Sequence, residues 1–107
     1  MATDWFRKTT WMAADEQDFE AHLKRSRGTY NKSQYLRIQA SHLQGARPPL
    51  YAQALRLLER VLTEHRDDSQ VASALFQKAE CLVATSGFDS AIPVFREGLA
   101  FERSHPG

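Results

Sequence analysis

The stretch GFDSAIPVFREGLA, residues 87–100, decides how this chain folds. Its small and large apolar residues recur every three or four positions, which is the spacing of one helix face. Pro93 falls near the first turn, where few amide hydrogens have helical partners. Gly87 favours the end of a preceding helix. The stretch therefore predicts a helix over about 89–103, with four residues on its inward side: Ala91, Phe95, Gly98 and Leu99.

A second stretch, YAQALRLLERVL at residues 51–62, carries a similar order of small and large residues. A Leu-Ala-Leu stripe at helical spacing precedes each of the two stretches. The chain thus predicts two helical hairpins, over about 32–44 with 50–65, and over about 70–84 with 89–103. Asn31 is a candidate N-cap with Gln34 at the capping-box spacing, and Asp67–Ser69 supplies an N-cap for the second hairpin. The matching stripes are Leu36, Ala40, Leu43 and Leu75, Ala79, Leu82.

The paired hairpins resemble the tetratricopeptide repeat, in which small residues let adjacent helices approach closely. Gln39 and Lys78 depart from the family, because they stand where it favours a large apolar residue. The resemblance implies an all-α fold: a right-handed superhelix of about five helices, with an N-terminal capping helix over about 14–25. We expect one domain over 1–107, with an aromatic segment and capping helix at 1–30, one repeat at 31–66 and another at 67–104.

The chain opens with an aromatic segment, DWFRKTTW at residues 4–11. Two stacked hairpins leave their ends uncovered. We expect Trp5, Phe6 and Trp11 to lie across the first helix and replace a missing repeat; a partner-binding aromatic patch is the alternative. A short extended stretch is possible at 5–11. Together with YLRIQA, this opening also resembles an uncharacterised bacterial group of helical-repeat proteins, whose members continue beyond FERSHPG, so we expect a shortened chain or a short homologue.

The first helix of each hairpin is expected to line a concave face. Arg37 is the first candidate there, since its planar fork can hold a carboxylate or phosphate. The resemblance implies that such a basic group grips an acidic or C-terminal carboxylate of a peptide. A solvated or structural role for Arg37 is the alternative. The expected groove residues are Gln34, Arg37, Ser41, Gln44, Ser73, Phe76, Gln77 and Glu80.

The basic residues are unevenly placed, although the formal net charge is only +1. Residues 21–58 contain no Asp or Glu, and they hold a basic cluster that could contact phosphates, with Tyr30 and Tyr35 positioned to stack on bases. The alternative is a helix end that complements its own dipole. The possible anion-contacting residues are Lys24, Arg25, Arg27 and Lys32.

Catalytic and metal-binding patterns are not found in the sequence. Cys81 is the single cysteine and has no partner for a disulfide, so we expect a buried thiol in a cytoplasmic protein. The four histidines lack metal-ligand spacing, and we expect no cofactor and no membrane span. The first expectation for function is a non-enzymatic adaptor that binds a protein or peptide. A nucleic-acid accessory protein and a self-associating homodimer are the alternatives.

Overall fold

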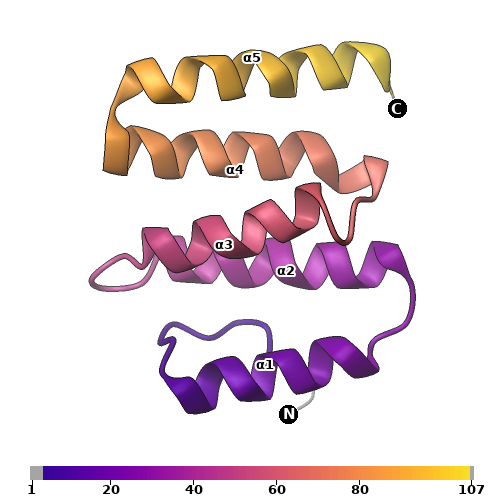
Figure 1. The fold of residues 1–107 in the computed structure, drawn as a ribbon, viewed down its shortest axis with the longest axis vertical. Coiled ribbons are helices and arrows are strands. Elements are labelled where there is room, and N and C mark those ends of the chain that lie inside the picture. Colours follow the sequence, from indigo (N-terminus) through magenta and orange to yellow (C-terminus); the bar gives the residue numbers. More distant parts are fainter. Residues whose placement is uncertain (1–3, 107) are drawn as a thin grey trace.

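The computed structural model describes residues 4–106, which form five helices and no strand. In chain order these are α1 (Ala13–Arg25), α2 (Thr29–Gln44), α3 (Tyr51–Leu62), α4 (Asp68–Ser86) and α5 (Phe88–Ser104). Figure 1 shows them stacked along the long axis of the molecule, with α1 at one end and α5 at the other. The all-α prediction is confirmed for this part of the chain.

Two antiparallel hairpins make up most of the stack: α2 pairs with α3, and α4 pairs with α5. The helix stripes face one another, and Leu36, Leu58 and Leu75 are almost fully buried. The second hairpin closes tightly because Gly98 presents no side chain to Phe76. A Cβ atom at Gly98 would lie only 2.6 Å from the Phe76 ring.

The N-terminal aromatic segment lies against α1, as predicted, and it also contacts α2 and so links the two helices. The Trp5 ring centroid lies 5.4 Å from that of Phe19 on α1 and 4.8 Å from that of Tyr35 on α2. The Trp5 ring also stacks on His22 at 5.1 Å, and Trp11 packs edge-on against Phe19. These aromatic side chains therefore serve burial between α1 and the first hairpin.

Gln39 is polar although the repeat pattern favours an apolar residue at its position, and its hydrogen bonds give the reason. Its side chain is completely buried. Its Oε1 accepts a hydrogen bond from the Lys8 amide at 3.0 Å, and its Nε2 donates to the Lys8 carbonyl at 2.8 Å. Gln39 thus satisfies both backbone groups of Lys8, in the way a neighbouring strand would. No strand forms at 5–11.

Two helix boundaries differ from the prediction. The N-cap assigned to Asn31 is wrong, because α2 begins at Thr29 after Gly28, and the Asn31 side chain instead donates to the Arg27 carbonyl at 2.9 Å. The third helix was expected to reach His65 but ends at Leu62. Beyond the end of α3, the His65 amide donates a hydrogen bond to the Arg60 carbonyl at 3.0 Å. The N-cap expected near Asp67 is confirmed, since its carboxylate accepts from the Ser69 amide.

The outer face of α5 holds a further difference. Leu99 was expected on the inward side, but 46% of it is exposed. The helix packs inward through the small residues Ala91 and Gly98, so the buried arc is narrow. Leu99 follows Gly98 by about 100° around the helix and points outward.

Candidate functional site

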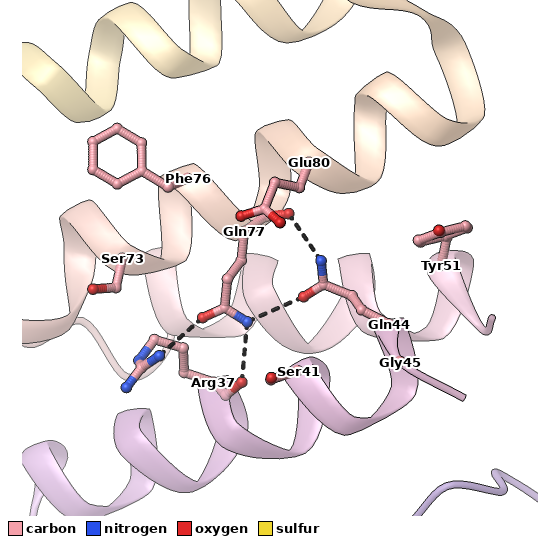
Figure 2. Close-up of a pocket in the computed structure, with 9 residues that line it drawn as sticks. All are labelled: Arg37, Ser41, Gln44, Gly45, Tyr51, Ser73, Phe76, Gln77 and Glu80. Atoms are coloured by element: carbon pink, nitrogen blue, oxygen red, sulfur yellow. Dashed lines mark hydrogen bonds between the residues drawn. The ribbon is translucent and has the colours of Figure 1, made fainter. Parts of the chain in front are cut away.

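A pocket opens between α2 and α4, with a cavity volume of about 590 Å³. Seven of the eight expected groove residues line it (Figure 2). The exception is Gln34, which lies one turn before Arg37 on α2 and is not among the lining residues. The structure thus brings together side chains that the repeat pattern placed on the first helix of each hairpin. The lining residues are Arg37, Ser41, Gln44, Gly45, Tyr51, Ser73, Phe76, Gln77 and Glu80.

Arg37 is held in a fixed position by two glutamines from α4. Its Nε donates to Gln70 Oε1 at 2.7 Å, and its Nη1 donates to Gln77 Oε1 at 3.1 Å. Gln70 is itself buried. These bonds occupy two of the five guanidinium N–H groups, and the others are left for a further acceptor. Because the partners are neutral amides, the positive charge of Arg37 is oriented without being neutralised.

Gln77 continues these contacts into a hydrogen-bonded ladder across the two hairpins. Its Nε2 donates to the Arg37 carbonyl at 3.2 Å and to Gln44 Oε1 at 3.1 Å. The Gln44 side chain donates in turn to the Gln77 carbonyl at 3.4 Å. Figure 2 shows this ladder along the floor of the pocket. Such a connected network holds the side chains in one arrangement before any ligand arrives.

Other polar groups in the pocket remain available to a ligand. Ser41, Ser73 and Glu80 are exposed, and their side chains have no hydrogen-bond or ion-pair partner within residues 4–106. Arg37 and Glu80 therefore give the pocket one positive and one negative pole. The half-buried ring of Phe76 supplies an apolar surface on α4.

Two lining residues were missed by the sequence reasoning. Gly45 is the C-cap residue of α2. Tyr51, the first residue of α3, is only half buried, and its side chain borders the pocket. The Pro48-Pro49 pair is the one sequence signal that could have placed Tyr51 at a rim, because it marks a loop folding back before α3.

The structure separates the four members of the basic cluster. Lys32 is engaged within the protein: its Nζ donates to the carbonyls of Leu23 at 2.7 Å and Lys24 at 3.4 Å, at the end of α1. It therefore satisfies helix-terminal acceptors. Lys24, Arg25 and Arg27 are exposed at the α1–α2 junction.

A smaller pocket of about 330 Å³ lies beside this junction and includes Arg60 and His65. Arg60 is occupied by ion pairs, with N–O distances of 2.6 Å to Glu20 and 3.0 Å to Glu64. Burial, together with the nearby Arg60 charge, lowers the pKa of His65. Its ring is therefore neutral near pH 7. Of the cations that line this pocket, Arg60 and Lys32 are engaged within the protein, whereas Lys24 is exposed.

The structure also locates the groups that catalysis or metal binding would use. Cys81 is completely buried, and burial raises the pKa of its thiol to about 11, which makes it a poor nucleophile. Among residues 4–106, no group of three His, Cys, Asp or Glu side chains could hold a metal ion. None of the helices in this range combines the length and apolar character needed to cross a bilayer.

Comparisons with protein-family models, with curated proteins and with solved structures gave no match to this chain. The tetratricopeptide-repeat resemblance and the resemblance to the bacterial group therefore stay predictions.

Proposed function

We propose that this protein is a non-enzymatic binding module that holds a segment of another protein or a peptide in the α2–α4 pocket. The observation that carries the proposal is the Arg37 guanidinium, fixed by Gln70 and Gln77 and still offering N–H groups to the pocket. A fixed guanidinium suits a planar carboxylate, because little conformational freedom is lost when the two groups pair.

The two poles of the pocket suggest the polarity of the bound segment. An acidic side chain or a C-terminal carboxylate pairs with Arg37, and a basic or N–H-donating group pairs with Glu80. An apolar side chain between them lies on Phe76. The proposal follows the tetratricopeptide-repeat resemblance in placing the ligand on the first helices, and the lone free thiol of Cys81 suits the reducing cytoplasm as its compartment.

The test is a library of random peptides, displayed with free or amidated C-termini, screened against the wild-type protein. The best binder is then titrated by fluorescence polarisation against variants. Arg37→Lys keeps the charge but loses the fork and should weaken binding about tenfold. Ser73→Glu leaves the ladder intact, places a carboxylate in the pocket and should abolish binding of acidic peptides.

Arg56→Glu is the matched control, because Arg56 is exposed on α3 and does not line the pocket. It should bind as the wild type does. Binding that survives Ser73→Glu and Arg37→Lys unchanged would refute the pocket as the site.

Nucleic acid is tested in the same series with labelled single strands at low salt. The peptide proposal would be replaced if the chain bound nucleic acid with an affinity that falls steeply with salt. That binding would also have to be lost when Lys24, Arg25 and Arg27 are replaced, and it would have to persist in Ser73→Glu.

A further inference from the structure

The terminal helix α5 exposes an apolar stripe on its outer face. Phe88 is 70% exposed, Ile92 41% and Leu99 46%. These residues repeat at helical spacing and therefore form a single line along α5. Figure 1 shows α5 as the outermost helix, with α4 on its inner side and no other helix beyond it. Contiguous exposed apolar patches on a protein surface often mark interaction sites.

Charged residues at the two ends of α5 complement one another. Asp89 lies beside Phe88 in the first turn, and Arg103 lies in the last turn. They are within roughly 40° of each other around the helix, so they flank the stripe on the same side. Neither has an ion-pair partner within the described part of the chain. Since they are at opposite ends of α5, they cannot pair with each other inside one molecule.

We propose that the outer face of α5 binds the same face of a second copy of this chain, with the two helices antiparallel. A two-fold axis near the middle of α5 places Ile92 of one copy against Leu99 of the other. The same axis brings Asp89 against Arg103 of the second copy, twice by symmetry. A parallel pairing would instead put like charges together. The stripe and the charges thus favour the same arrangement.

The expected contact between the two copies is small. A helix of 17 residues is about 25 Å long, and one helix pair of that length buries on the order of 1,000 Å², near the lower limit for a specific interface. Arg96 is exposed on the same face and lies close to the axis, where it meets its own copy. We therefore expect a weak dimer, with a dissociation constant in the micromolar range.

Sedimentation velocity of the full chain, from micromolar to near-millimolar concentration, tests this proposal. Asp89→Arg and Arg103→Asp should each weaken the dimer about tenfold, because two ion pairs are lost and two repulsions are gained. The double variant Asp89→Arg/Arg103→Asp restores both pairs and should recover the wild-type constant. Arg96→Ala should strengthen the dimer by removing the repulsion at the axis.

Ile92→Lys should leave the chain monomeric over the whole concentration range. Arg56→Asp, on the distant helix α3, is the matched control for charge reversal and should dimerise like the wild type. Far-UV circular dichroism of each variant separates a lost contact from a lost fold.

A wild-type chain that stays monomeric at the highest concentration would overturn the proposal. So would a dimer that is indifferent to Ile92→Lys and to both single charge reversals. A different protein held by the wild type and released by Ile92→Lys, with no dimer present, would assign the face to that partner and would equally overturn it.

Discussion

Replacing Gln39 with leucine should destabilise this protein, although leucine is the kind of residue that the repeat pattern favours at this position. The Gln39 side chain is buried and makes two hydrogen bonds to the backbone of Lys8. Leucine would leave the Lys8 N–H and C=O groups without partners, at a cost of about 1–3 kcal/mol each. The added apolar burial would return about 1–2 kcal/mol.

The net loss should be about 2 kcal/mol of unfolding free energy, which lowers the melting temperature of a chain of this size by roughly 10 °C. Urea unfolding followed by circular dichroism measures the global change. The fluorescence of Trp5 and Trp11 reports on the N-terminal segment itself, because both rings pack in the cluster with Phe19.

Gln34→Leu is the matched control for this substitution. Gln34 lies on the same helix and is half buried, but its side chain has no hydrogen-bond partner within residues 4–106. Its replacement should change stability by less than about 0.5 kcal/mol. A Gln39→Leu variant as stable as Gln34→Leu would show that the Lys8 backbone finds water instead, and it would refute the idea that Gln39 anchors the segment.

Three further predictions concern other parts of the fold. Gly98→Ala should destabilise the chain by about 1–3 kcal/mol in urea unfolding, despite the better helix propensity of alanine, because the new Cβ meets the Phe76 ring; an unchanged midpoint would mean that the ring moves freely into the pocket. The hydrogen bond and the charge of Lys8 lower the pKa of Asp18 below its ordinary 3.8, so this contribution to stability is complete above that pH and is lost as pH falls through the lowered value; an Asp18→Asn variant should lose this part of the acid dependence of tryptophan fluorescence. Burial raises the pKa of the Cys81 thiol to about 11, so Ellman's reagent at pH 8 should label it only after denaturant is added, and rapid labelling of the native protein would contradict its burial.

The helices could be predicted from sequence because each has a clear apolar stripe. Leu36 on α2, Leu58 on α3 and Leu75 on α4 each belong to an apolar stripe of their own helix, and all three are buried in the core. Leu99 shows where such a pattern stops being informative. An apolar residue on an end helix has no further layer to cover it, and sequence spacing does not state which helix is last.

The pocket could be predicted in part for a related reason. Arg37, Gln44 and Gln77 lie on first helices of the hairpins, so the repeat geometry places them on one face. Tyr51 reaches the same pocket from the start of α3, and its place depends on how the preceding loop folds back. The structural role of Gln39 could not be predicted from the sequence pattern either. Its hydrogen-bond partners are backbone groups of Lys8, and the amino-acid sequence does not indicate which backbone groups a side chain will bind.

The two proposed surfaces lie on different sides of the second hairpin, and this separates their roles. No residue of α5 lines the α2–α4 pocket, so a dimer through the outer face of α5 leaves both pockets open. Two peptide sites on one dimer would bind a surface bearing many ligands more tightly than a single site does, with no new contact to the ligand. The Ile92→Lys variant should therefore bind a free peptide as the wild type does but dissociate faster from a densely coated surface. Equal dissociation from that surface would show that the two pockets do not act together.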